Sequence, residues 1–133
     1  MLWININASR YAWKIRKKQK NIELYASDTE EGFRIETTID GMEIYADGEG
    51  YFETFQRCRD KILDLGYGLK CNGARINAVQ SNLMSACEKI YLVEIGKQAQ
   101  LKDIVFIWDY AEIQEFPNTK EQQEFTEQWL KHT

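Results

Sequence analysis

The sequence predicts an α+β fold with a mostly antiparallel β-sheet of about six to eight strands, one main helix packed on it and a shorter C-terminal helix. Three observations lead to this prediction. Apolar and polar residues alternate over most of the first fifty positions, which is typical of half-buried strands. Residues 51–65 instead carry apolar side chains at intervals of three and four, as an amphipathic helix does. A second helical pattern occupies residues 119–131.

Three short strands are expected at the start of the chain. Their alternating apolar residues are Leu2, Ile4 and Ile6 in the first, Tyr11, Trp13 and Ile15 in the second, and Ile22 and Leu24 in the third. The polar residues 17–21 are expected to connect the second strand to the third.

A hairpin is predicted at Asp40 and Gly41, because Asp and Gly accept the positive φ angles of a type I′ turn. This turn sets the register of both arms. Ile39 then faces Met42, Thr37 faces Ile44 and Ile35 faces Ala46 on the inner side, while Thr38–Glu43, Glu36–Tyr45 and Arg34–Asp47 pair on the outer side. Apolar residues therefore gather on one face of the hairpin.

The helix over 51–65 presents a stripe made by Tyr51, Phe55, Cys58, Ile62 and Leu65. Gly66 follows and suits a left-handed C-terminal cap.

A second hairpin is predicted at Asn72 and Gly73, with Cys71 facing Ala74 and Leu69 facing Ile76. We interpret Asn72, Gly73 and Arg75 as structural residues of this turn. For Arg75 we expect an acidic partner within the fold, although a guanidinium beside a tight turn can also hold an external carboxylate.

The last third begins with a single turn capped by Ser81. Residues 90–95 and 104–108 then form consecutive strands, and 104–108 is apolar throughout, as a central strand covered on both faces would be. Thr119 and Gln122 form a plausible capping box for the helix over 119–131, which carries Phe125, Trp129 and Leu130.

The composition is that of one globular domain spanning residues 1–133, with 44% apolar and 29% charged residues. We expect no membrane span and no secretion signal, since the longest apolar run is 104–108 and the N-terminus lacks a basic and then long apolar stretch. Three cysteines without a CxxC pair favour free thiols in the cytoplasm. We predict neither a metal site nor a cofactor.

Catalysis is not expected either. The only histidine, His132, lies next to the C-terminus, and no nucleophile elbow, phosphate loop or zinc-protease motif occurs. Cys71, Asn72 and Arg75 stand close together, but a hairpin turn explains their spacing.

Charge is segregated along the chain, although the net charge is only −4. The first twenty residues are basic, but strand alternation turns Tyr11 and Trp13 away from the neighbouring cations, so we expect no nucleic-acid site.

Residues 21–60 are strongly acidic. An acidic surface for a basic partner is therefore predicted. The alternative is an ordinary solvated surface, part of whose charge Arg34, Arg57 and Arg59 neutralise within the fold. The candidate residues of the acidic surface are Asp28, Glu30, Glu31, Glu36, Asp40, Glu43, Asp47 and Glu49. Of these, Glu36 and Glu43 are expected on the solvent side of the hairpin, and Asp28, Glu30, Glu31, Asp47 and Glu49 in the flanking loops.

Three segments carry a resemblance to a known group of proteins. Residues 71–75 read CNGAR, residues 77–84 read NAVQSNLM and residues 90–97 read IYLVEIGK. Over about residues 52–108 the chain resembles small bacterial proteins that are often immunity proteins of interbacterial toxin systems, including contact-dependent growth inhibition.

The resemblance implies a binding protein that neutralises the C-terminal domain of a cognate toxin, and many such toxins are basic nucleases. It implies no enzymatic activity. The alternative is a cytoplasmic module that binds another protein or a small ligand.

Overall fold

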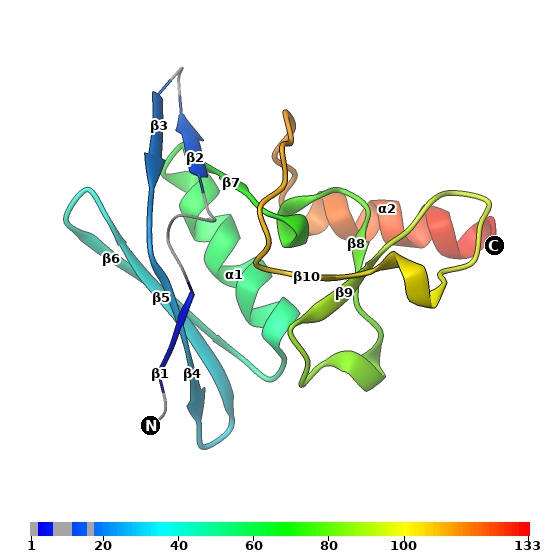
Figure 1. Ribbon diagram of the computed structural model, residues 1–133, viewed down its shortest axis with the longest axis horizontal. Coiled ribbons are helices and arrows are strands. Elements are labelled where there is room, and N and C mark those ends of the chain that lie inside the picture. Colours follow the sequence, from blue (N-terminus) through cyan, green and yellow to red (C-terminus); the bar gives the residue numbers. More distant parts are fainter. Residues whose placement is uncertain (1–2, 7–11, 16–17) are drawn as a thin grey trace.

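The computed structural model describes residues 3–6, 12–15 and 18–133 (Figure 1). The strands in this part of the chain are β1 (Trp3–Ile6), β2 (Ala12–Ile15), β3 (Lys18–Asn21), β4 (Leu24–Thr29), β5 (Gly32–Ile39), β6 (Met42–Gly48), β7 (Gly68–Lys70), β8 (Ala78–Val79), β9 (Lys89–Leu92) and β10 (Ile104–Phe106). The helices are α1 (Tyr51–Asp64) and α2 (Thr119–Lys131), and short 3₁₀ turns are η2 (Asn72–Ala74), η3 (Asn82–Met84) and η4 (Leu101–Asp103). The predicted α+β class is confirmed. Neither α-helix of the described chain has the length and apolarity that a membrane crossing requires.

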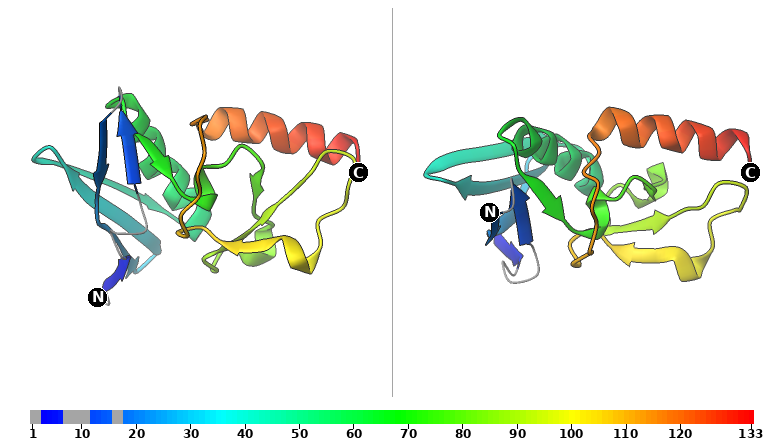
Figure 2. Two further views of the ribbon diagram at one scale, coloured as in Figure 1. Left: turned by 45° about the horizontal axis from the view of Figure 1, so that its top comes forward. Right: turned by 90° about the horizontal axis from the view of Figure 1, so that it is seen from above.

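All strand pairs among the described residues are antiparallel, but the strands form three sheets and not the single sheet that we predicted. Their orders are β1-β4-β5-β6, β3-β2-β7 and β10-β9-β8. Helix α1 packs on β5 and β6 and also contacts β7 and η2, so it stands between the four-stranded sheet and the sheet of β8 to β10 (Figures 1 and 2). Because the helix occupies this space, the strands that follow it pair with β2 or with one another.

The hairpin of β5 and β6 has the predicted turn and register. Asp40 and Gly41 have φ angles of 51° and 79°, and all six predicted cross-strand pairs are present. The inner residues are buried apart from Met42, which is 52% exposed because the hairpin tip extends past α1 (Figure 1).

Helix α1 ends one residue earlier than predicted and buries the expected stripe except for Leu65, which follows the helix and is 37% exposed. The residues Phe55, Cys58 and Ile62 are buried, and each is only 1% exposed. The chain leaves the helix through Gly66 at a φ of 92°, as the left-handed cap requires. Helix α1 contacts the four-stranded sheet on one side, and Phe55 packs on Trp108 and Gly73 on the other, which holds the helix in place.

The predicted hairpin at Asn72 and Gly73 is wrong. Residues 72–74 form the 3₁₀ turn η2, in which Ala74 N–H donates to Cys71 O at 3.1 Å, and Gly73 is not among the residues with positive φ. Strand β7 pairs with β2. The reason is tertiary, because Gly73 N–H donates to Ile107 O at 3.0 Å and the turn is buried instead of projecting into solvent.

Residues 18–21, predicted as a connection, form strand β3. This strand pairs with β2 at the edge of its sheet, with Ala12 opposite Asn21 and Ile15 opposite Lys18. Backbone pairing does not require an apolar side-chain pattern, which explains why alternation failed to detect this strand.

The two predicted strands are present as β9 and β10, both shorter than expected. They pair with each other, and β10 is an edge strand and not a central one. Ile104 and Val105 are half-buried, and Phe106 is 45% exposed. A short apolar run does not by itself distinguish an edge strand from a covered one.

Helix α2 begins as predicted, but its capping residues are Asn118 and Glu121, not Thr119 and Gln122. Asn118 Oδ1 accepts from Glu121 N–H at 2.9 Å, and Glu121 Oε1 accepts from Asn118 N–H at 3.0 Å. This shift of one residue turns Gln122 toward the core. Ser81 precedes η3 as expected, although its side chain makes no capping hydrogen bond.

Candidate protein-binding groove

A groove of about 740 Å³ lies where the β4–β5 turn and the end of β6 meet the first turns of α1. We call it the acidic groove. It is lined by Thr29, Glu30, Glu31, Arg34, Asp47, Gly48, Glu49, Glu53 and Arg57. Five carboxylates and two guanidinium groups therefore share one concave surface, whose charge is net negative.

Two glycines and a threonine bring these elements together. A Cβ on Gly32 would lie 2.2 Å from Gly48 O, and a Cβ on Gly48 would lie 2.5 Å from Thr54 Oγ1. Thr54 Oγ1 itself donates to Gly50 O at 2.6 Å. Larger side chains at the two glycines would push the β4–β5 turn, the end of β6 and α1 apart.

The arginines hold the walls of the groove in place. Arg34 donates from Nε and Nη2 to the two carboxylate oxygens of Asp47, at 2.7 and 3.0 Å. This bidentate bond lowers the pKa of Asp47 and raises that of Arg34. Arg57 pairs with Glu53 at 2.9 Å and donates to Asp47 O at 2.8 Å. Strand β6 is thereby connected to both β5 and α1.

Three carboxylates of the groove are not neutralised in this way. Glu30, Glu31 and Glu49 are exposed and have no cation within 4.0 Å among the residues that the structure describes. They supply the unbalanced negative charge.

The eight acidic residues predicted as a partner surface do not lie on one surface. Glu30, Glu31, Asp47 and Glu49 line the groove. Glu36 and Glu43 lie on the outer sheet face, as predicted, on the same side as Asp47, but they do not line the groove. Asp40 lies at the hairpin tip, where it accepts from the Tyr67 hydroxyl.

Two of those residues lie in strands where loops were predicted. Asp28 belongs to β4 and Asp47 to β6. Asp28 pairs with Phe33 in the row that faces α1, and its charge helps to raise the pKa of Tyr51. The alternation of strand side chains separates Asp28 from Glu36 and Glu43.

Glu53 was not predicted to belong to this surface, whereas Arg34 and Arg57 were named as cations that neutralise part of it under the alternative interpretation. A signal was present for the helical pair, because Glu53 and Arg57 are four residues apart and such pairs lie on one face of a helix. The sequence did not show that this face borders the hairpin.

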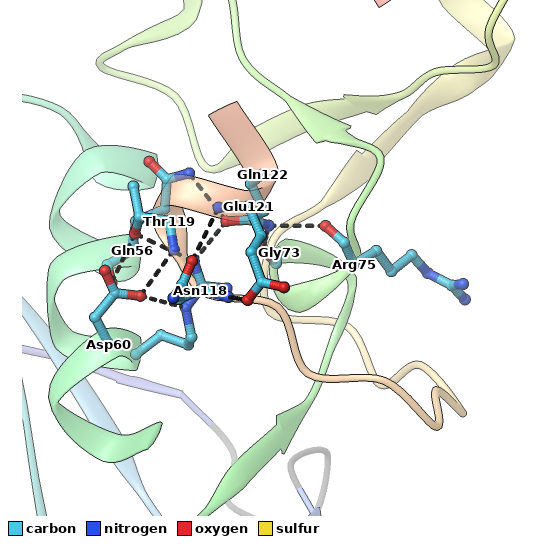
Figure 3. A network of polar contacts seen from close by, with 9 residues as sticks. Gln56, Asp60, Gly73, Arg75, Asn118, Thr119, Glu121 and Gln122 are labelled. Carbon is cyan, nitrogen blue, oxygen red and sulfur yellow. Dashed lines mark hydrogen bonds and ion pairs between the residues drawn. The ribbon is translucent and has the colours of Figure 1, made fainter. Parts of the chain in front are cut away.

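The turn at residues 72–75 belongs to a separate buried network (Figure 3). Gln122 Nε2 donates to Gly73 O at 2.9 Å and to Arg75 O at 2.7 Å, while Gln122 Oε1 accepts from Arg59 Nη2 and Gln56 Nε2. Asn72 Nδ2 donates to Phe106 O at 3.2 Å. These contacts connect the turn to α1, α2 and β10.

Arg59 is the buried charge in this network. Its side chain is 1% exposed and donates from Nε to Asp60 Oδ1 at 2.9 Å. Burial lowers its pKa, while Asp60 acts in the opposite direction. Its Nη1 has no hydrogen-bond partner among the described residues.

The cysteines are free thiols. Burial raises the pKa of Cys58 and of Cys71 to about 12, so neither is a thiolate at neutral pH. His132 is exposed at the end of α2. Among the described residues, no three His, Cys, Asp or Glu side chains are grouped so that they could hold a metal ion.

No protein-family model matches the chain, and no curated protein is significantly similar to it.

Proposed function

We propose that this chain is an immunity protein of an interbacterial toxin system, which binds a cognate toxin domain in the cytoplasm and neutralises it. The observation that carries the proposal is the acidic groove, in which no cation of the described part of the chain pairs with Glu30, Glu31 or Glu49. Such a surface attracts a basic partner and accelerates its association.

The two arginines of the acidic groove hold it in a fixed shape, and this favours the binding of a partner. Arg34 and Arg57 cross-link the groove walls through Asp47 and Glu53. A preformed concave surface loses less conformational entropy on binding than a flexible one. Basic side chains of the partner would meet Glu30, Glu31 and Glu49 without displacing these internal pairs.

Co-expression with a toxin tests the proposal. If the adjacent reading frame encodes a large secreted protein, as the proposal predicts, the chain is produced with the C-terminal domain of that protein, and cell growth and complex formation are measured. We expect the wild type to restore growth. The groove variant Glu30→Lys, Glu31→Lys, Glu49→Lys should lose protection and associate at least tenfold more slowly at low salt, with a smaller salt dependence.

The matched control reverses three charges outside the groove. Glu36→Lys, Glu43→Lys and Asp64→Lys change the net charge by the same amount on the outer face of the hairpin and at the end of α1, outside the groove. Both variants are checked for folding by circular dichroism. A stronger defect in the control variant would move the interface to the hairpin face, and protection by both variants would overturn the charge-based proposal.

A further inference from the structure

Arg75 differs from the other arginines that the structure describes. Arg34, Arg57 and Arg59 each pair with a carboxylate, at distances of 2.7 to 2.9 Å. Arg75 has no ion pair within 4.0 Å among the described residues, so the acidic partner expected within the fold is wrong. Among the described arginines, Arg75 is the one without a carboxylate partner, although the net charge of the chain is −4.

The Arg75 side chain is nevertheless oriented. Its Nε donates to Asn72 Oδ1 at 3.2 Å, and its backbone carbonyl accepts from Gln122. Figure 3 shows the Arg75 side chain extending away from the buried network, so that its two terminal nitrogens point away from Gln122 and its partners. Two parallel N–H groups in this geometry match the two oxygens of a carboxylate.

Arg75 lines a cleft of about 290 Å³ together with Ile76, Ile113 and Pro117. The isoleucines are half-buried and the proline is buried, so they provide apolar walls beside the guanidinium. The exposed carboxylate of Glu115 also lines the cleft but does not come within 4.0 Å of Arg75. A cation beside apolar walls is complementary to a carboxylate on a short aliphatic chain.

We propose that this cleft binds a small aliphatic monocarboxylate, with the carboxylate held by the two terminal nitrogens of Arg75 and the aliphatic part against Ile76, Ile113 and Pro117. Glu115 opposes the bound anion and limits its affinity. The cleft shares no residue with the acidic groove, so this binding does not depend on the proposed function.

Titration of the isotope-labelled full chain with sodium hexanoate at constant ionic strength tests the proposal. We expect saturable NMR shifts of the Arg75 Nε–H signal and of the Ile76 and Ile113 methyl groups. Acetate lacks the aliphatic chain and hexylammonium lacks the anion, so both should bind at least tenfold more weakly. Shifts that are equal for hexanoate and acetate, or that do not saturate, would overturn the proposal.

Variants separate the cleft from general charge effects. Arg75→Gln should weaken hexanoate binding at least tenfold, and Glu115→Gln should tighten it a few-fold. Arg57→Gln, in the acidic groove, should leave it unchanged. If Arg75→Gln fails to fold, Arg75→Lys decides the question, because it keeps the charge without the paired donors and should bind several-fold more weakly than wild type. Unchanged binding in the Arg75 variants would refute the assignment.

Discussion

The turn at Asp40 and Gly41 and the turn at Asn72 and Gly73 have similar local chemistry and different surroundings. At the first, both residues have positive φ, and a Cβ on Gly41 would meet nothing within 4 Å. At the second, a Cβ on Gly73 would lie 2.7 Å from Ile107 Cγ2 and 2.9 Å from Phe55 Cε2. Glycine is therefore needed for backbone conformation in the first turn and for close packing in the second.

The two turns also differ in what holds them. The hairpin is stabilised by its neighbours in sequence, through cross-strand pairs such as Arg34 with Asp47. The turn at residues 72–75 is held by Gln122, which is 47 to 49 positions away, and by Ile107. A local rule predicts structure well where local contacts dominate, and it fails where distant residues provide the hydrogen bonds.

The largest expected effect is the removal of the distant partner. Gln122→Leu deprives two buried carbonyls and the Arg59 guanidinium of hydrogen bonds, and we expect a loss of about 3 kcal/mol in the free energy of unfolding. Urea denaturation measures it. Gln123→Leu, at the exposed neighbouring position, should change stability by less than about 0.5 kcal/mol. A small effect at Gln122 would mean that the turn forms without tertiary support.

The glycines distinguish the two turns directly. Gly73→Ala should cost about 2 kcal/mol, because the added methyl group overpacks Ile107 and Phe55. Gly41→Ala should cost about 1 kcal/mol through the left-handed backbone conformation. Substitution by asparagine separates backbone strain from overpacking, since asparagine tolerates positive φ but is larger than alanine. Gly41→Asn should be close to wild type and Gly73→Asn the least stable of the four variants, as measured by thermal unfolding; equal behaviour of the two Asn variants would contradict the comparison.

The smallest expected effect concerns the ion pair of the hairpin. Arg34 lowers the pKa of Asp47 below its ordinary value of 3.8, so the pair stabilises the fold at higher pH. That contribution is lost as the pH falls through the lowered pKa. Asp47→Asn should therefore reduce the melting temperature by only about 1 °C at pH 6, because both side chains are exposed, and this difference from wild type should disappear once the pH lies below the lowered pKa of Asp47. A difference that persists when Asp47 is protonated would assign the effect to something other than charge.

Several features were determined by the sequence itself. The alternation in residues 34–47 with Asp40 and Gly41 between the arms was enough to predict six of the seven cross-strand pairs of the hairpin. The spacing of Tyr51, Phe55, Cys58 and Ile62 predicted α1 and the face it buries. In these segments the turn, the alternation and the helical period are properties of neighbouring residues, so no distant contact was needed to predict them.

Tertiary structure alone decided the rest. It placed Asn72 and Gly73 in a buried turn, made β10 an edge strand and brought Glu53 and Arg57 beside Glu30 and Glu31 in the acidic groove. It also left Arg75 without an internal carboxylate. These outcomes depend on which surfaces α1 and α2 cover, and that is set by the packing of segments far apart in the chain. Local patterns reveal which residues are buried, but not which distant residues they contact.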